Sequence, residues 1–235
     1  MRRSFENSVV IAATRERVWL ALTDPNELNR WETTDAHLDL RSGGGFLYEY
    51  AYGPSRPGTF LVVDPPRRLM QDNLVFHHNT GYHYINTTTL EPAGDGTRLT
   101  VLVEGYGDSD AEQWLLESMD LGWETDMRIL KAYVEWGQDL RPRLWRGLRM
   151  GLQYISHGDG GGIRVLEALD GGPAQTAGLE PGDVVTTLDD TPFDDFRGFR
   201  SLLERYRPGD TATLGVHPGG TGELQRRKLT FGDAR

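Results

Sequence analysis

The sequence predicts an α+β fold in two parts: an antiparallel sheet that grips a long helix, followed by a small β-barrel or sandwich with two helices. Runs of β-branched and aromatic residues alternate with glycine and proline clusters over the first half. One apolar stripe at helical spacing closes that half. Near residues 139–143 the helical pattern meets proline and charge, which predicts domains at residues 1–140 and 143–235.

The composition narrows the classes of function. Hydrophobic residues make up 37% of the 235 residues, enough for a core in each half. Cysteine is absent, which excludes disulfides and thiolate metal sites. The net charge of −10 comes almost entirely from residues 1–142, so we expect no nucleic-acid partner. The first residues are polar and charged and no apolar run is long enough for a membrane span, so we expect a cytoplasmic protein.

A strand and two short helices are expected first. Residues 9–12 are a β-branched run that predicts the strand. Thr14 offers a side-chain N-cap for the first helix. Asp24 then offers an N-cap for the second, with Pro25 at its first position and Glu27 closing a capping box.

A strand-rich stretch follows, whose spacing predicts an antiparallel meander. The aromatic residues Phe46, Tyr48 and Tyr50 alternate with other residues and therefore share one face. The expected strands cover residues 36–40, 46–52, 58–63, 69–76, 82–91 and 97–106.

A long helix closes the first half. Ser109 and Glu112 form a capping box at its start. Gly122 leaves open whether the helix is bent or divided. The apolar stripe consists of Met119, Trp123, Met127, Leu130 and Val134.

In this order, the motifs resemble the START-like SRPBCC superfamily, in the branch named after the heat-shock-protein-90 ATPase activator. The matching pieces include Asp24-Pro25, Trp31, Arg41-Ser42-Gly43-Gly44, Val63-Asp64-Pro65-Pro66 and Gly122-Trp123. The resemblance implies a helix-grip fold and a cavity for a hydrophobic small molecule or a client segment. It implies no fixed catalytic set. The residues expected to line the cavity are Trp31, Tyr48, Tyr50, Tyr84, Trp123 and Met127.

The second half contains two further helices. The small residues after Pro173 and the stop at Gly178 predict a short, tight helix, and Pro181-Gly182 predicts a turn into a strand. Apolar positions between residues 193 and 209 predict the other helix. Strands are expected at residues 211–217 and 224–231.

The run Pro-Ala-x-x-Ala-Gly-Leu-x-Pro-Gly-Asp-Val-Val at residues 173–185 resembles a bacterial PDZ domain. That family binds an extended peptide as an added strand and holds its terminal carboxylate on loop amides. Carried over by position, the resemblance implies a C-terminal peptide of a partner protein as the ligand. The implied peptide-binding residues are Met150, Gly151, Leu152, Gln153, Tyr154, Phe196, Arg200 and Leu203.

Two departures from the PDZ pattern leave alternatives open. Residues 147–150 offer a second register for the loop. Asp189-Asp190 stands where a turn ending in glycine is usual, so that turn is expected to differ. Phe196 at the helix start, instead of histidine, argues against selection of a serine or threonine hydroxyl in the peptide.

Other candidate sites are weaker. His77, His78 and His83 suggest a metal cluster, but adjacent strand residues face opposite ways, so we expect no metal site. Glu49 and Glu104, with Tyr84, are acid–base candidates without a second group at a defined spacing.

We therefore expect a non-enzymatic binding protein with two modules, without cofactor, metal or catalytic residues. The alternatives are an enzyme of the polyketide cyclase or hydratase type tethered by its PDZ domain, and a co-chaperone-like ATPase regulator. Convergent polar groups with shifted pKa values inside the cavity would favour the enzyme.

Overall fold

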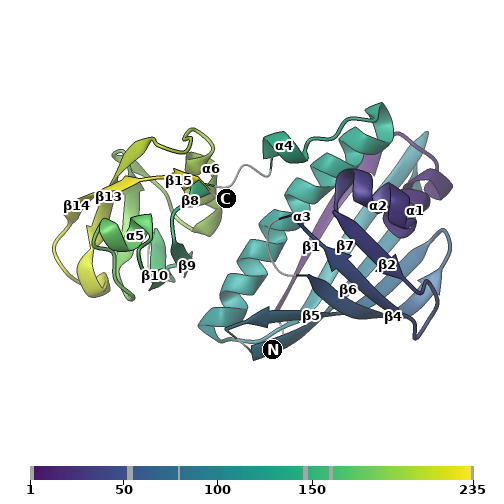
Figure 1. Ribbon diagram of the computed structural model, residues 1–235, viewed down its shortest axis with the longest axis horizontal. Coiled ribbons are helices and arrows are strands. Elements are labelled where there is room, and N and C mark those ends of the chain that lie inside the picture. Colours follow the sequence, from purple (N-terminus) through teal and green to yellow (C-terminus); the bar gives the residue numbers. More distant parts are fainter. Residues whose placement is uncertain (1–2, 52–54, 79, 145–147, 159–160, 234–235) are drawn as a thin grey trace. The chain divides into compact units, whose positions relative to one another are not determined.

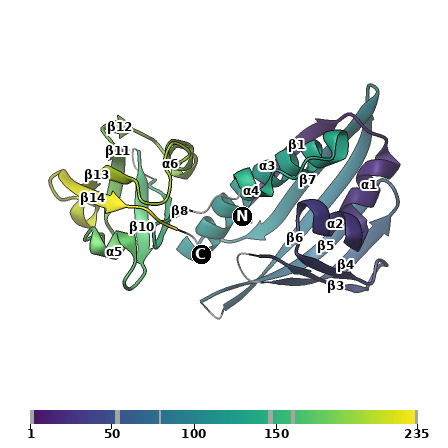
Figure 2. The ribbon, with the colours of Figure 1, turned by 45° about the horizontal axis from the view of Figure 1, so that its top comes forward.

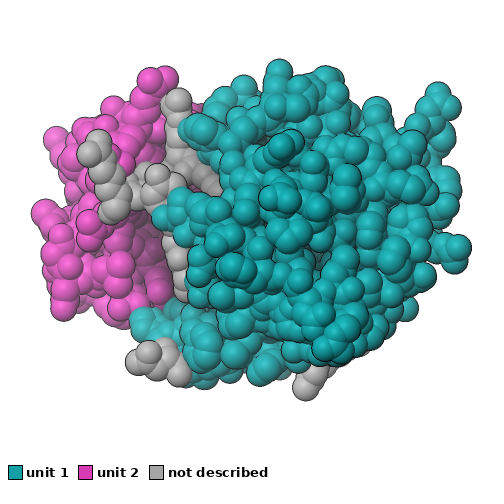
Figure 3. Space-filling model, turned by 45° about the vertical axis from the view of Figure 1, so that its right-hand side comes forward, with its two compact units in different colours: residues 1–145 teal, residues 146–235 magenta. Residues whose placement is uncertain are grey.

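A computed structural model describes residues 3–51, 55–78, 80–144, 148–158 and 161–233. The chain divides into two compact units, residues 1–145 and 146–235, which are coloured separately in Figure 3. Among the described residues, no helix is both long and apolar enough to cross a membrane.

The first unit is a seven-stranded antiparallel sheet in the order β1-β7-β6-β5-β4-β3-β2. This is the expected meander, and β1 joins it beside the last strand. The helix-grip prediction is confirmed, because the long helix α3 (Asp110–Trp136) packs against β1 and β7 (Figures 1 and 2). The strands are β1 (Arg3–Ile11), β2 (Asp35–Leu38), β3 (Gly45–Glu49), β4 (Arg56–Asp64), β5 (Arg68–His77), β6 (Thr80–Ala93) and β7 (Gly96–Tyr106). Tyr52 of the strand expected at 46–52 lies outside the described residues.

Side-chain caps fix the short helices where the sequence places them. Thr14 accepts a hydrogen bond from the Arg17 amide at the start of α1 (Arg15–Thr23). Asp24 accepts bonds from two amides at the start of α2 (Pro25–Trp31). The expected capping box at Glu27 is wrong, because the Glu27 carboxylate accepts hydrogen bonds from Arg17 and from the hydroxyl of Tyr133 instead.

The start of α3 is confirmed as a reciprocal capping box between Ser109 and Glu112. The helix continues through Gly122 without a break and ends at Gly137, whose φ of 66° is the left-handed conformation common at helix ends. A single uninterrupted helix therefore spans the sheet.

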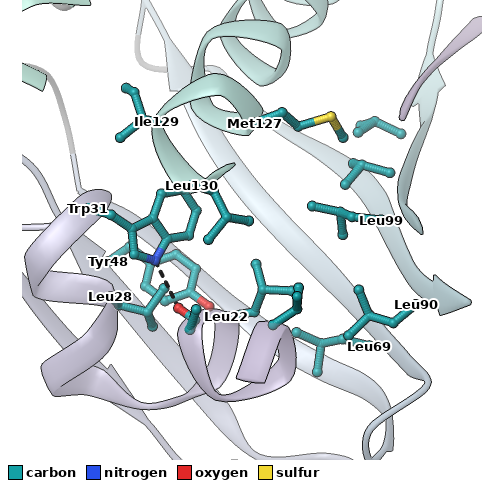
Figure 4. Packing of buried hydrophobic residues seen from close by; sticks show 14 of the residues in the cluster. Leu22, Leu28, Trp31, Tyr48, Leu69, Leu90, Leu99, Met127, Ile129 and Leu130 are labelled. Carbon is teal, nitrogen blue, oxygen red and sulfur yellow. Dashed lines mark hydrogen bonds between the residues drawn. The ribbon is translucent and has the colours of Figure 1, made fainter. Parts of the chain in front are cut away.

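The core of the first unit lies between the sheet and its helices. Trp31 is 1% exposed and its indole N–H donates to the Ala21 carbonyl at 2.8 Å, the dashed bond in Figure 4. Ala21 would normally accept from the residue four positions later, which is Pro25 and has no amide hydrogen. The tryptophan thus satisfies a buried carbonyl that the chain's own proline leaves unpaired.

The segment after α3 belongs to the first unit. The guanidinium of Arg141, in α4 (Arg141–Leu144), donates to the carbonyls of Asn29, Arg30 and Thr33 at 2.9 to 3.3 Å. Leu140 and Leu144 pack against the core of this unit. These contacts hold the chain to the first unit beyond residues 139–143, where the sequence pattern breaks.

The second unit is a small β domain with short helices, as expected. Its main sheet has the order β14-β13-β11-β10-β9, with β12 paired to β11, and β8 pairs with β15. The strands are β8 (Leu148–Arg149), β9 (Leu152–Ser156), β10 (Ile163–Ala168), β11 (Val184–Leu188), β12 (Thr191–Pro192), β13 (Thr211–His217), β14 (Gln225–Thr230) and β15 (Gly232–Asp233). The helices are α5 (Pro173–Thr176), α6 (Phe196–Leu203) and the 3₁₀ turn η1 (Pro218–Gly220).

The turn at Asp189-Asp190 joins β11 to β12 without a glycine. Both residues have positive φ, 46° and 61°, as a two-residue hairpin turn requires. The Asp189 carboxylate stabilises this conformation by accepting from the Thr213 amide at 2.6 Å and from the Tyr206 hydroxyl at 2.8 Å. The departure from the PDZ pattern is therefore compensated by two side-chain hydrogen bonds.

The expectation that His77 and His78 face opposite ways is wrong. His78 lies in the turn after β5 with φ of 46°, and the two ring centroids are 4.3 Å apart. His83 instead places Nδ1 3.0 Å from Oδ1 of Asp72. Within the described part of the chain, no three histidine or carboxylate side chains are grouped so as to hold a metal ion.

Candidate functional site

A cavity lies in the first unit and is lined from α1, β3, β4, β5, β6 and α3. Its volume is about 30 Å³, which is room for about two water molecules. A cavity this small accommodates only a few non-hydrogen atoms unless its walls move.

The floor of the cavity is polar because two neighbouring strands turn polar residues inward. Gln71 and Asn73 share the buried face of β5 with Leu69, and Asn86 and Thr88 share the buried face of β6. Gln71 pairs directly with Asn86 in the sheet. All four polar side chains are at most 5% exposed. Buried polar groups at this density need hydrogen-bond partners.

Some of these partners are present within the cavity wall. The Gln71 amide donates to the Tyr48 hydroxyl at 3.1 Å, and the Asn73 amide donates weakly to the Gln71 carbonyl at 3.4 Å. Asn86 differs, because its Oδ1 atom is buried and has no hydrogen-bond partner in the described structure. The floor thus contains an amide whose hydrogen-bonding capacity is unused.

Glu32 and Arg56 are the charged residues of the lining, and both are partly buried. The Tyr50 hydroxyl lies 3.2 Å from Oε1 of Glu32, and the Arg56 guanidinium lies 5.1 Å from the centroid of the Tyr50 ring. Burial, reinforced by the charge of Asp126 on α3, raises the pKa of Glu32 to about 7, while Arg56 and the Tyr50 hydrogen bond oppose the rise. Glu32 therefore changes charge close to neutral pH.

Three tyrosines complete the polar wall. Burial raises the pKa of Tyr48, Tyr50 and Tyr84 above the usual value. Their hydroxyls consequently stay protonated and remain hydrogen-bond donors at any physiological pH. Leu22 and the indole of Trp123 supply apolar surface on the remaining sides.

The second candidate site is the edge of β9 in the second unit. Among the described residues, β9 pairs with β10 only, so its other edge has no neighbouring strand. The helix α6 lies alongside: the Tyr154 ring of β9 is 4.9 Å from that of Phe196 and 5.1 Å from that of Phe199. The Phe196 amide also donates to the Ser156 hydroxyl at 2.9 Å. We call the unpaired side of β9, with the loop before it, the β9 edge.

In the loop at the start of the β9 edge, the backbone carbonyls accept hydrogen bonds, whereas the backbone amides are open, which means that they donate to no described backbone carbonyl. The Met150 carbonyl accepts from Ala174 and the Gly151 carbonyl accepts from Leu169, both at 2.8 Å. Across the described chain, the amides of Met150 and Gly151 donate to no other backbone carbonyl. Gly151 has φ of 63°, and a Cβ there would lie 3.2 Å from Gly172 Cα. Two successive open amides of this kind form an anion-binding arrangement.

Comparison with known families addresses both units. The family model described as "Activator of Hsp90 ATPase homolog 1-like protein" matches residues 12–135, more than half of the chain. The chain belongs to this family. The AHSA1-like domain is followed by a match to the PDZ domain family at residues 148–224. Among curated proteins, none matches the chain.

Solved structures resemble the AHSA1-like domain in fold. Protein MLL2253 from Mesorhizobium loti is 21% identical with a TM-score of 0.50, covering 55% of this chain and 94% of its own. The Aha1 dimer from Colwellia psychrerythraea is 16% identical with a TM-score of 0.52, covering 58% of this chain and 98% of its own. CalU16 from Micromonospora echinospora is 29% identical over 57% of this chain and 74% of its own, with a TM-score of 0.48. The first two similarities show the fold of the AHSA1-like domain.

Four of the six residues expected to line the cavity lie in its wall: Tyr48, Tyr50, Tyr84 and Trp123. Trp31 and Met127 are instead buried in the core that Figure 4 shows, where they are 1% and 4% exposed. The lining is more polar than the resemblance implies.

The residues that give the cavity its chemistry are ones that the sequence-based predictions missed, above all Glu32, Arg56 and Asn86. The acid–base candidates Glu49 and Glu104 are exposed and lie outside the lining. The sequence did contain an indication of the polar floor: Gln71 and Asn73 fall on the same side of their strand as the buried Leu69. No comparable pattern marks Glu32 or Arg56.

Of the residues expected to bind peptide, Met150 to Tyr154 belong to the β9 edge, and Phe196, Arg200 and Leu203 lie on α6. Met150, Tyr154, Phe196 and Leu203 are buried, whereas Arg200 is exposed on α6. Leu152 and Gln153 are partly buried in β9. The alternative loop register includes Gly147, which lies outside the described residues.

Proposed function

We propose that this AHSA1-like protein is a binding protein with two modules and not an enzyme. Its PDZ domain holds the carboxyl terminus of a partner protein, and its AHSA1-like domain holds a small molecule in the cavity. The observation that supports this most strongly is the β9 edge, where a strand with one edge unpaired among the described residues directly follows two open amides.

A peptide that binds beside β9 would extend the main sheet by one strand. Such a strand satisfies the unpaired backbone groups of an edge and makes affinity independent of most side chains. The amides of Met150 and Gly151 would then meet the peptide's last carboxylate, since several convergent donors replace the water that an anion loses.

The side chains near the β9 edge indicate which peptides would bind. Met150 and Leu203 are apolar and 5% exposed, so they favour an apolar last side chain. The Phe196 ring packs against that of Tyr154 and offers no group that could bond a hydroxyl. We therefore propose that the peptide ends in an apolar residue and has no requirement for serine or threonine upstream.

The test is a library of C-terminal peptides, each made with a free and an amidated terminus and titrated against the full chain. We expect free carboxylates to bind at least about tenfold tighter, because an amide lacks the charge that the open amides favour. The variant Gly151→Ala should weaken binding, since its Cβ meets Gly172 at 3.2 Å.

Gly171→Ala is the matched control, because Gly171 has a similar φ of 68° but open space around its Cβ position. This variant should retain binding. Equal affinity for free and amidated peptides would refute capture of the carboxylate.

Native mass spectrometry of freshly purified protein tests the cavity part of the proposal. A small molecule that co-purifies with the chain, and leaves when Trp123 is replaced by a smaller residue, would support binding in the cavity. Retention of the molecule by that variant would place it elsewhere.

A second candidate function, an acid–base enzyme, is favoured by the polar groups with shifted pKa values that converge in the cavity. The foremost is Glu32, which has a pKa of about 7 and lies 3.2 Å from the Tyr50 hydroxyl. A carboxyl that titrates near neutral pH suits proton transfer. An enzyme would convert the captured molecule, so its mass would change over time with the native chain and stay constant with Glu32→Gln. A mass that stays constant with both chains would reject the enzyme.

A further inference from the structure

We infer that the cavity of the AHSA1-like domain is a site for a small carboxylate, held by Arg56, by the amide of Asn86 and by the hydroxyls of Tyr48 and Tyr84. The inference rests on the proposed binding function of the cavity and adds the chemical class of the ligand. In the wall of the cavity, the hydrogen-bond donors and acceptors do not balance.

Asn86 supplies the first part of that imbalance. Its side chain is 4% exposed and its Oδ1 has no partner among the described residues. The oxygen and nitrogen of an asparagine amide exchange by a half-turn of the side chain, so the amide as a whole is free to donate or to accept. Buried amides are almost always paired, which indicates that a molecule in the cavity completes this one.

The other unused groups are donors. Arg56 contacts the face of the Tyr50 ring and has no ion pair within 4 Å in the described structure. Tyr48 accepts from Gln71 and so keeps its own hydroxyl proton for another acceptor. Tyr84 also lines the cavity, and its hydroxyl stays protonated because burial raises its pKa. A ligand with two acceptor oxygens matches this set, and a planar carboxylate matches the fork of a guanidinium.

The charge of the lining favours an anion when Glu32 is protonated. Arg56 then carries the remaining charge of the lining, which is positive and is partly offset by the charge of Asp126 on α3. The groups that act on Glu32 are Asp126 from α3, Arg56 from β4 and Tyr50 after β3. Asp126 lies outside the lining, and its negative charge disfavours ionisation of Glu32.

This arrangement couples binding to protonation. A carboxylate beside Glu32 repels its ionised form, so binding requires Glu32 to be neutral. Because Glu32 titrates at a pKa of about 7, affinity should be high on the acid side of neutrality and fall as the pH rises through 7.

The size of the cavity determines which small molecule serves as the probe in a binding experiment. Because the cavity has room for only about two water molecules, the probe must be among the smallest carboxylates, and acetate is chosen. Acetamide and acetamidinium have the same shape as acetate and differ in charge, which is neutral and positive. The three probes therefore separate charge from fit.

The experiment titrates each probe into the full ¹⁵N-labelled chain and follows the indole N–H of Trp123 and the amides around Asn86 by NMR. We expect acetate at about pH 6 to bind at least about tenfold tighter than acetamide and acetamidinium. Affinity for acetate should fall by about tenfold toward pH 8. In Glu32→Gln this pH dependence should disappear, with tight binding retained at pH 8.

Arg56→Gln should lose acetate binding, while Arg68→Gln, an exposed arginine of β5, should retain it. If Arg56→Gln does not fold, Arg56→Lys replaces it and should bind acetate more weakly than the native chain. Equal binding in Arg56→Gln and the native chain would overturn the inference.

The outcomes also separate this inference from the proposed function. If acetamide or acetamidinium shifts the cavity signals and acetate does not, the ligand class is wrong and the cavity remains a binding site. If none of the three probes shifts them, the inference fails. A molecule found in the cavity by native mass spectrometry would still support the proposed function in that case.

Discussion

Replacing Glu32 by glutamine should change how the stability of the AHSA1-like domain depends on pH. In the native chain Glu32 is partly buried between Tyr50, Arg56 and the cavity, and its pKa rises from 4.5 to about 7. Glutamine has nearly the same shape but no charge. The variant therefore isolates the energetic cost of ionising this one side chain.

The sign of this pH dependence follows from whether the folded or the unfolded chain binds the proton more tightly. Between pH 4.5 and 7 the folded chain holds a proton on Glu32 that the unfolded chain has lost. The free energy of unfolding therefore decreases as the pH rises through this range and stays at the lower level above pH 7. At ~1.4 kcal/mol per pH unit, and with allowance for solvent screening of a partly exposed group, the loss is about 2 to 3 kcal/mol. Glu32→Gln should avoid it.

Tryptophan fluorescence during urea unfolding measures this free energy selectively, because all six tryptophans lie in residues 1–145. The difference in stability between Glu32→Gln and the native chain should grow by about 2 to 3 kcal/mol from pH 4.5 to 7.5. Glu104→Gln, an exposed carboxylate on β7, is the control and should show no such growth. Parallel pH profiles for Glu32→Gln and the native chain would refute the burial of Glu32.

Three further substitutions test the fold. Trp31→Phe leaves the Ala21 carbonyl unpaired and should cost about 1 to 3 kcal/mol, measured by urea unfolding; no loss would contradict that hydrogen bond. Ser109→Ala removes the capping box of α3 and should cost about 1 kcal/mol in the same assay, whereas an unchanged midpoint would contradict the cap. Asp189→Ala removes two acceptors at a residue with positive φ and should lower the stability of the PDZ domain by about 1 to 3 kcal/mol, measured by circular dichroism; native stability would contradict the role of this turn.

The parts of the fold that depend on local chemistry were predictable from the sequence. Thr14, Asp24 and Ser109 cap their helices as the residue types indicate, since a cap involves only the next three residues. The strands followed from alternation and from glycine and proline between them. Glu27 shows the limit of this approach, because its carboxylate bonds Tyr133, which is 106 residues away in the chain.

The chemistry of the cavity was less predictable because it depends on groups brought together from distant elements. Glu32 follows α2, Arg56 begins β4 and Asn86 lies in β6, and no spacing in the sequence connects them. The alternation of side chains along a strand did not predict the orientation of His78, because this residue lies in a turn with positive φ. Gln71 and Asn73 do indicate a polar interior, because they alternate in phase with the buried Leu69, and Asn86 and Thr88 do the same with the buried Leu90.

A single NMR experiment on the ¹⁵N-labelled full chain tests most directly whether the two modules bind separately. Acetate is added first, and then the tightest peptide from the C-terminal library. Acetate should shift signals around Glu32, Asn86 and Trp123, and the peptide should shift those of Met150, Gly151 and β9. Shifts of neither set, or a peptide that shifts only residues away from β9, would contradict the two-module account.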